Sequence, residues 1–275
     1  GYLSANAVTK IRLVIFKKNG QILEETPFFQ QMIEGIEEEC HRLGYEMVIS
    51  HVDQRNPNYQ KQVRDLLEEQ GVGIILLGTE MMDGDLSLYR NASCPVLLLD
   101  HWTESMDFNS VLINNADAAR AITEHLLDNG HREVGYLRGN YRIKAFRSRF
   151  IGFQTALKKY KVPYKEEYTV TVGTYMSTAC QDMLEYLKKK PKLPTAFFAD
   201  NDIIALGAMK ALQEMGYRIP EDISIVGFDD LTFSEISSPP LTTLRVEKRE
   251  MGKMAVRRLV ELIDGIGTST VTKIQ

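Results

Sequence analysis

The sequence contains few of the residues that would indicate a disulfide framework or a membrane segment. Only three of its 275 residues are cysteine, at positions 40, 94 and 180, with no CxxC spacing between them. An odd number of widely separated thiols fits a reducing compartment better than a disulfide framework. No apolar run approaches the roughly 20 residues that cross a bilayer. The first ten residues, GYLSANAVTK, also lack the apolar centre of a signal peptide, so we expect a cytoplasmic protein.

Catalytic and metal-binding signatures are missing as well. The sequence has no GxSxG nucleophile motif, no GxxxxGK[ST] phosphate loop and no HExxH zinc motif. Its five histidines, at 41, 51, 101, 125 and 131, include no pair at the spacing of helical metal ligands. A net charge of −4 lacks the basic excess of a stand-alone nucleic-acid binder. We therefore expect no enzymatic activity, no cofactor, no metal site and no direct DNA contact by this chain.

Short apolar runs alternate with amphipathic helical segments along almost the whole chain. This alternation, at intervals of about 30 residues, predicts an α/β fold built from doubly wound parallel sheets. Strands are expected at residues 11–16, 45–52, 73–77, 95–100, 110–114, 133–137, 168–172, 195–199 and 223–226. Helices are expected at 28–43, 59–70, 117–129, 149–160, 177–190 and 251–263, with a further helix between Asp202 and Gly216.

The stretch 195–230 shows where a ligand would bind. An apolar strand is followed at once by Asp200-Asn201-Asp202, and the next strand ends in Gly227-Phe228-Asp229-Asp230. A strand, a helix and a second parallel strand form one right-handed crossover unit. Ligands of such sheets bind beyond the carboxyl ends of the strands. We therefore expect the two acidic clusters to converge on one site.

Several longer motifs together resemble a known family. ADNDIIALGAMKALQEMGYRIPEDISIVGFDD, followed by PPLTTLRVEKREMG, is similar to the effector-binding core of LacI/GalR transcription regulators. The resemblance continues through GHREV at 130–134 and RFIGF at 149–153, and it covers the chain from Ile11 to about Ile263. It implies a fold like that of periplasmic sugar-binding proteins. Such a fold has two α/β lobes, a cleft between them, a hinge of several crossovers and a preceding DNA-binding headpiece.

The resemblance also suggests how the chain is divided. Residues 1–10 would be a remnant of the headpiece linker. Residues 11–114 with 243–264 would form the N-terminal lobe, and residues 115–242 with 265–275 the C-terminal lobe. Two consecutive prolines, Pro239 and Pro240, exclude a helix where the chain turns away from the second lobe. The last stretch, Val271–Gln275, is expected to be a short strand of the second lobe.

Candidate effector-binding residues follow strands or begin helices. A hydroxyl-rich ligand needs paired donors and acceptors and an apolar face to stack on. Arg149 offers a planar fork of donors, Asp229 and Asp100 offer carboxylate acceptors, and Asn201 can both donate and accept. Stacking walls would come from aromatic side chains. The complete set is Phe28, Phe29, Asp100, His101, Trp102, Arg149, Tyr175, Asn201 and Asp229.

Structural roles compete with these assignments. Asp100 and Asp229 could each cap a turn at a strand end, and Asn201 could cap a helix while it also binds a ligand. Phe28 and Phe29 could both belong to the core. In relatives that stack a tryptophan on the ligand, that residue is one position past the aspartate. Here His101 occupies that position and Trp102 comes one residue later.

The sequence therefore suggests the effector-binding and dimerising part of a sugar-responsive regulator of the LacI/GalR type. Operator DNA would be bound through a headpiece that this chain lacks, and the chain would form a homodimer. The alternative is a periplasmic sugar-binding protein of a transporter or chemoreceptor, because the two classes share a fold. A monosaccharide, a disaccharide, a sugar phosphate, a purine-like base or a phosphoprotein corepressor would each fit as effector.

Overall fold

The structure is a computed structural model that describes residues 8–24, 26–266 and 270–274. It divides into two compact units, Gly1–Ile113 with Glu247–Gln275 and Asn114–Val246. Of the expected headpiece linker, residues 1–7 lie outside the described residues. Within the described ranges, no helix combines the length and apolar character that a bilayer crossing needs.

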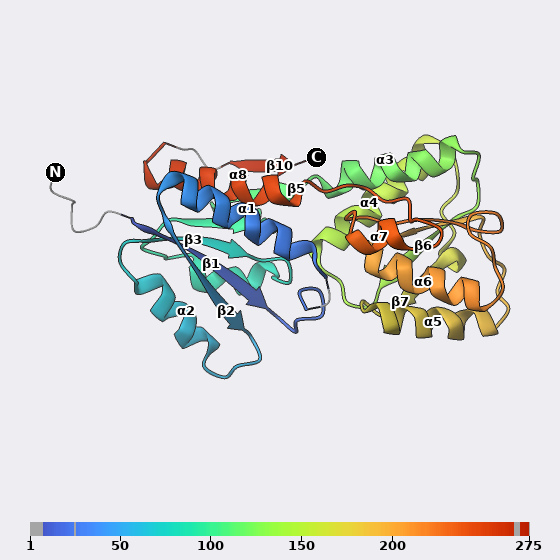
Figure 1. Cartoon of the computed structure of the whole chain (residues 1–275), viewed down its shortest axis with the longest axis horizontal. Helices are drawn as coiled ribbons and strands as arrows, with labels where there is room; N and C mark the ends of the chain where they lie inside the picture. The colour runs from blue at the N-terminus through green and yellow to red at the C-terminus, as the bar shows by residue number, and fades with distance from the viewer. Residues whose placement is uncertain (1–7, 25, 267–269, 275) are drawn as a thin grey trace. The chain divides into compact units, whose positions relative to one another are not determined.

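The first unit is built around a six-stranded parallel sheet in the order β10-β5-β4-β3-β1-β2 (Figure 1). Its elements in chain order are β1 (Lys10–Lys17), α1 (Phe28–Leu43), β2 (Glu46–Asp53), α2 (Tyr59–Glu68), β3 (Val72–Leu77), the 3₁₀ helix η1 (Asp83–Tyr89), β4 (Val96–Leu99), β5 (Asn109–Ile113), α8 (Lys248–Ile263) and β10 (Val271–Ile274).

Two helix layers cover this sheet. α1 and α8 pack along each other, and α8 also contacts β3, β4 and β5. α2 and η1 contribute Val63, Leu67 and Leu86 to an apolar cluster with the strands. Every residue of β3 is buried, as the apolar run 73–77 predicts for a central parallel strand.

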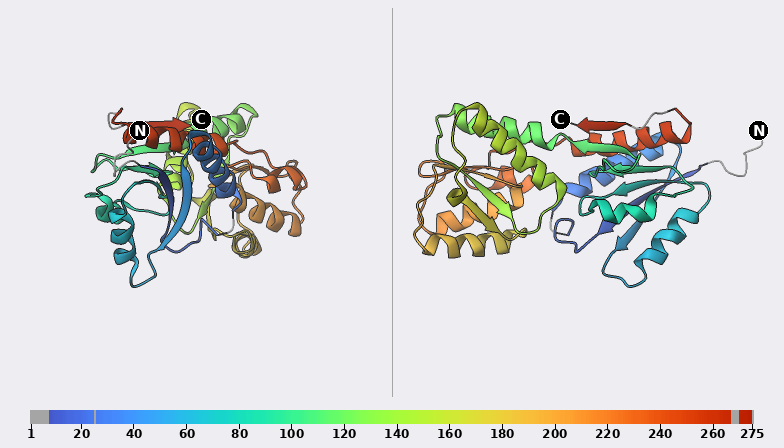
Figure 2. Two further views of the ribbon diagram at one scale, coloured as in Figure 1. Left: turned by 60° about the vertical axis from the view of Figure 1, so that its left-hand side comes forward. Right: turned by 180° about the vertical axis from the view of Figure 1, so that it is seen from behind.

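The last strand corrects the expected division of the chain. Val271–Ile274 pairs in parallel with β5, so it belongs to the first unit and not to the second (Figure 2). The side chain of Asn109 accepts a hydrogen bond from the backbone N–H of Thr270 (3.0 Å), and Ser110 donates to the carbonyl of Thr270 (3.0 Å). These contacts attach Thr270, the residue before β10, to the start of β5. The placement of residues 265–275 in the second lobe was therefore wrong, and residues 243–246 belong to the second unit.

The second unit contains a four-stranded parallel sheet in the order β7-β6-β8-β9. Its elements are α3 (Asn115–Asp128), β6 (Val134–Gly139), α4 (Lys144–Lys159), the 3₁₀ helix η2 (Glu166–Tyr168), β7 (Thr169–Val172), α5 (Met176–Lys188), β8 (Ala196–Ala199), α6 (Asp202–Glu214), β9 (Ser224–Val226) and α7 (Thr232–Ile236). The two-sheet, doubly wound α/β fold is therefore as predicted.

The helices of this unit pack in two pairs, α3 with α4 and α5 with α6 (Figure 1). In the RFIGF motif, Gly152 faces α3 so closely that a Cβ atom there would lie 2.1 Å from the carbonyl oxygen of Ala116. The motif thus sets the spacing of α3 and α4. α4 begins at Lys144 and not at Arg149, so Arg149 lies in its second turn. The short helix α7 was not predicted from the sequence.

Candidate functional site

The four strands of the second unit end at one edge of its sheet. Because all four strands are parallel, the residues after Gly139, Val172, Ala199 and Val226 emerge on the same side. Doubly wound sheets bind their ligands at this carboxyl edge. The loops that follow these strands therefore make up the first candidate site.

The guanidinium of Arg149 is the centre of this site. Its Nε donates to Asn115 Oδ1 (2.8 Å), and one Nη donates to the carbonyl oxygen of Asp200 (2.7 Å). The other Nη lies 3.2 Å from Asp229 Oδ1 and forms an ion pair with it. Only 4% of Arg149 is exposed, and a guanidinium this deeply buried needs such partners. Arg149 thus holds the start of α3 and the ends of β8 and β9 around one group.

Phe228, in the GFDD motif, supports this guanidinium from one side. The central carbon of the Arg149 guanidinium lies 3.7 Å from the ring centroid of Phe228, which is completely buried. A cation over an aromatic face at this distance is attracted by the ring. The contact also fixes the plane of the guanidinium, so its N–H donors have defined directions.

Asn201 lies between two buried aspartates at the end of β8. Its Oδ1 accepts from a backbone N–H in the first turn of α6 (3.0 Å), which is the expected capping role. Asp200 accepts from the hydroxyl of Tyr136 (2.5 Å), and Asp202 accepts from the hydroxyl of Ser234 (2.6 Å). Burial raises the pKa of both carboxyl groups. Asp202 was expected to converge on a ligand with Asn201, but its carboxylate binds protein groups.

Arg142, which with Lys144 and Arg147 forms a basic run before Arg149, also has a structural partner. Its Nη1 donates to Asp200 Oδ2, and the backbone N–H of Gly139 donates to the same oxygen (2.8 Å). Asp200 therefore anchors the loop after β6, and the charge of Arg142 is balanced within the unit.

Asp229 and Asp230 have an unusual backbone. Their φ angles are 118° and 52°, in the region that side chains other than glycine rarely adopt. Such residues cost about 1–3 kcal/mol each, and they concentrate at functional sites. The backbone N–H of Asp229 donates to the carbonyl of Leu244 (3.0 Å), while Asp230 pairs with Arg245 (2.7 Å). The two neighbouring aspartates thus face different partners.

Tyr175 is also at this edge, in the N-cap position of α5 after β7. Its ring is half-buried, and its carbonyl oxygen accepts from the hydroxyl of Thr178 (3.1 Å). Tyr175 therefore shares the edge with Arg149, Asn201 and Asp229, as its position after a strand suggested.

In the first unit, Asp100 is the strand-end carboxylate after β4. It has a φ of 57°, and its Oδ2 accepts from the hydroxyl of Thr79 (2.7 Å). Thr79 follows the neighbouring strand β3, so two strand ends meet at this carboxylate. His101 is completely buried, whereas Trp102 is half-buried, with ring centroids 6.4 Å apart. Burial distinguishes the two aromatic candidates, and the partly accessible ring is that of Trp102.

Phe28 and Phe29 occupy the first turn of α1 and are both buried. Their rings meet edge to face, with centroids 5.1 Å apart, and the ammonium of Lys248 lies 5.6 Å from the Phe28 centroid. Most of the surface of both side chains is therefore covered by protein, as the alternative of a core role predicts.

The sequence gave no reason to single out Glu80, which follows β3. This carboxylate is completely buried and accepts four backbone N–H groups at 2.8–3.1 Å, from residues 18, 19, 20 and 22. It therefore holds the loop between β1 and α1 at the carboxyl edge of the first sheet. The only feature of the sequence that could have indicated this role was an acidic residue shortly after an apolar strand.

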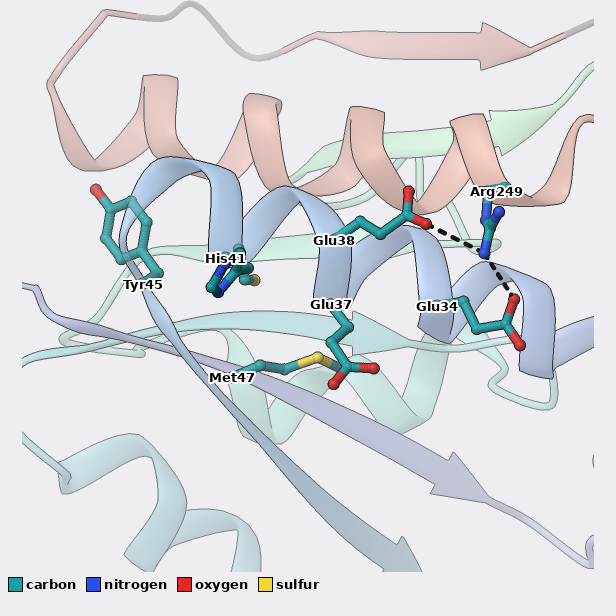
Figure 3. A pocket seen from close by; sticks show the side chains of 8 residues that line it. Glu34, Glu37, Glu38, His41, Tyr45, Met47 and Arg249 are labelled. Carbon is teal, nitrogen blue, oxygen red and sulfur yellow. Dashed lines mark hydrogen bonds and ion pairs between the residues drawn. The ribbon is translucent and has the colours of Figure 1, made fainter.

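A separate groove of about 500 Å³ lies beside α1 (Figure 3). Arg249 of α8 bridges Glu34 (3.0 Å) and Glu38 (3.1 Å) at its rim. None of the nine candidate residues lines it; its lining is Glu34, Glu37, Glu38, Cys40, His41, Tyr45, Met47 and Arg249. In the part of the chain that the structure describes, no group of three His, Cys, Asp or Glu side chains could hold a metal ion.

The fold and the site define a ligand-binding protein with parallel-sheet units, and comparison with known proteins specifies its class. Residues 123–274 match the family model of the periplasmic binding protein-like domain. The chain is 32% identical over 263 residues to the HTH-type transcriptional repressor PurR of Mannheimia succiniciproducens, covering 95% of this chain and 76% of the relative.

Solved structures agree with this match. The transcriptional regulator CelR in complex with cellobiose is similar with a TM-score of 0.85 and 26% identity, over 98% of this chain and 83% of that one. A Lac repressor dimer bound to operator and the anti-inducer ONPF is similar with a TM-score of 0.80 and 26% identity, over 96% and 91%. The chain therefore belongs to the LacI/GalR family of transcriptional regulators and is an effector-binding core of that family. The alternative of a transporter's periplasmic protein is not favoured.

Proposed function

We propose that the chain senses a neutral, hydroxyl-rich effector, a sugar or sugar derivative, and that it binds this effector without chemical turnover. The observation that carries this proposal is the Arg149 cluster, in which a rigid guanidinium holds the Asp229 carboxylate beside the end of β8. Carboxylates and guanidinium forks are suited to the paired donors and acceptors of vicinal hydroxyls. Because Asn201 uses its Oδ1 as a cap, its contribution would be the Nδ2 donor.

The charges of this site favour a neutral effector over an anionic one. Arg149 pairs with Asp229, and Arg142 pairs with Asp200. A sugar phosphate would have to compete with these carboxylates for both guanidinium groups. The relative CelR, which was solved with cellobiose, supports an uncharged sugar. Asp100, Phe28, Phe29, His101, Trp102 and Tyr175 stay candidates for further effector contacts.

Calorimetric titration of the chain tests this proposal. The probes are glucose, galactose, ribose, cellobiose and lactose, with glucose 6-phosphate and adenine as representatives of the other classes. We expect at least one neutral sugar to bind, and Asp229→Asn to weaken it by roughly thirty-fold or more, as for the loss of a buried charged partner. Asp222→Asn, at an exposed ion pair with Arg218 in the same unit, is the matched control. Binding of glucose 6-phosphate or adenine alone would contradict a neutral sugar effector.

We also propose that the chain forms a homodimer, for which a surface on the second unit is suited. Phe233 and Ile236 of α7 are 43% and 74% exposed. They line an apolar groove of about 430 Å³ with Met176, Leu206, Met209, Lys210, Gln213, Ser237 and Ser238. Exposed apolar side chains that line an apolar groove can pair with the same surface of a second copy through a two-fold axis.

Sedimentation of wild type and Ile236→Asp at micromolar concentration tests the dimer. Ile151→Asp is the matched control, because Ile151 is also an exposed isoleucine of the second unit, at 58%. We expect a dimer for wild type and the control and a monomer for Ile236→Asp. A wild-type monomer would contradict the dimer, and a dimeric Ile236→Asp would contradict this surface.

Operator DNA would be bound through an N-terminal headpiece of the family's type, in the cytoplasm. A net charge of −4 gives the chain itself little counterion release on DNA. We expect negligible binding of a LacI-type operator duplex by residues 1–275 in a mobility-shift assay at near-physiological salt. Tight, sequence-specific binding would show that these residues contain a DNA-contacting surface.

A further inference from the structure

Asp202 is next to the proposed effector contact Asn201, but its carboxylate is saturated by protein donors. Oδ2 accepts from the backbone N–H of Leu231 (2.9 Å) and the hydroxyl of Ser234 (2.6 Å), and Oδ1 accepts from the hydroxyl of Thr243 (2.5 Å). Asp202 has no exposed surface. A buried carboxylate with this many donors holds together the segments from which the donors come.

These donors surround the strained pair Asp229-Asp230. On one side, the backbone N–H of Asp202 donates to the carbonyl of Phe228 (2.9 Å). On the other side, its carboxylate accepts from the backbone N–H of Leu231, the residue that follows the pair. Thr243, bound to the same carboxylate, accepts from the backbone N–H of Asp230 (3.3 Å). Positive φ angles persist only where surrounding contacts enforce them. Here Asp202 binds the residues before and after the pair, and Thr243, which Asp202 holds, binds Asp230 within it.

The glycine of the GFDD motif makes this arrangement possible. A Cβ atom at Gly227 would lie 2.1 Å from Asp202 Oδ1, which is far inside contact distance. The end of β9 therefore approaches the carboxylate more closely than any other residue type would permit. The motif and the aspartate after Asn201 thus belong to one structural device.

Thr243 extends the device to the segment that leaves the second unit. Residues 242–245 run beside the end of β9, with parallel bridges between Val226 and Thr242 and between Asp229 and Arg245. The unit ends one residue later, at Val246. The same carboxylate is therefore bound to the backbone around Asp229 and to the exit segment.

We propose that Asp202 is a positioning residue for effector binding. It holds Asp229 in the backbone conformation in which the Asp229 carboxylate meets Arg149, and it links Asp229 to the exit segment through Thr243. The proposal rests on the effector role proposed above for Asp229. Asp202 itself does not contact the ligand.

Two substitutions of similar shape weaken the device. Asp202→Asn replaces one acceptor oxygen by a donor, so either the Thr243 hydroxyl or the Leu231 N–H loses its acceptor. Thr243→Val removes the hydroxyl that joins Asp202 to Asp230. We expect each to lower affinity for the neutral sugar that binds wild type best in the calorimetric panel, by roughly ten- to a hundred-fold, as for a misplaced binding group. Asp222→Asn, which changes the charge equally, should not change that affinity.

A double-mutant cycle separates positioning from general damage. If Asp202 acts through Asp229, Asp202→Asn should weaken sugar binding in the wild-type background and add less than about two-fold in the Asp229→Asn background, because coupled residues are not additive. An equal loss in both backgrounds, or wild-type affinity for both Asp202→Asn and Thr243→Val, would overturn the proposal.

Hydrogen exchange without ligand tests the device even if no sugar of the panel binds. We expect Asp202→Asn to speed amide exchange at residues 227–231 and 242–245, where the donors lie, and to leave β6 unchanged. If wild type binds no sugar of the panel, that result counts against the proposed sugar effector. The exchange measurement then still decides the role of Asp202. Unchanged exchange at 227–231 would refute that role.

Discussion

Two adjacent aspartates of the second unit offer a direct test of how the site is held together. Asp229 and Asp230 each pair with one arginine, but their surroundings differ greatly. The side chains of Arg149 and Asp229 are 4% and 9% exposed, whereas those of Arg245 and Asp230 are 73% and 30% exposed. Asp229→Ala and Asp230→Ala therefore remove the same chemical group from a buried and an accessible ion pair.

The expected magnitudes follow from this difference. Removing one partner of a buried pair leaves an uncompensated charge and costs roughly 3–5 kcal/mol. Arg149 keeps its bonds to Asn115 and to the Asp200 carbonyl, which holds the cost of Asp229→Ala near the lower end of that range. Removing Asp230 from an exposed pair should cost about 0–1 kcal/mol. Domains are typically stable by about 5–15 kcal/mol, so both variants should fold.

Urea unfolding followed by far-UV circular dichroism measures both costs. Arg149→Ala and the double variant Arg149→Ala/Asp229→Ala complete a cycle. We expect the double variant to be less destabilised than the sum of the two single variants. Equal effects of Asp229→Ala and Asp230→Ala, within about 0.5 kcal/mol, would refute the argument that burial makes the Arg149–Asp229 pair the structural centre of the site.

Three further predictions concern single residues outside this pair. Hydrogen bonds from Arg42 and Arg257 lower the pKa of Glu39 to about 2. This stabilisation should therefore be complete above about pH 4.5 and be lost as the pH falls towards 2, by at most about 3 kcal/mol. In urea unfolding between pH 2 and 6, the free energy of unfolding of Glu39→Gln should depend less on pH than that of wild type. Glu80→Gln replaces one of the two acceptor oxygens by an amide donor, so backbone N–H groups of the loop lose an acceptor and amide exchange at 18–22 should become faster. Unchanged exchange would contradict the anchoring role. Gly152→Ala should lower the free energy of unfolding by about 1–3 kcal/mol because of overpacking against α3, and a neutral result in urea unfolding would show that the helices can separate at little cost.

Much of the architecture followed from local sequence patterns. The helix Phe28–Leu43 was predicted with both ends as observed, because an apolar stripe ends at Gly44, whose φ of 79° is the usual helix-terminating conformation. The parallel strands were visible as short apolar runs such as 73–77. Since parallel strands place their carboxyl ends at one edge, the gathering of Arg149, Asn201 and Asp229 could also be predicted without coordinates.

The roles of neighbouring polar residues depended on the tertiary structure. Asp200, Asn201 and Asp202 are equivalent in sequence as polar residues after a strand. Only packing against Tyr136 and Ser234 directs the outer two into the protein. Their donors lie 64 and 32 positions away along the chain, so no local pattern could reveal them.

The partner of the last strand and the burial of Glu80 depend on distant contacts in the same way. Val271–Ile274 has the composition of a strand, but the sheet it joins is decided by where α8 packs and by the Asn109 side chain that captures Thr270. Glu80 is completely buried because a loop about 60 residues earlier directs four N–H groups at it. Apolar periodicity is a local property and specifies elements, whereas the satisfaction of a buried polar group depends on segments that meet only in the folded chain.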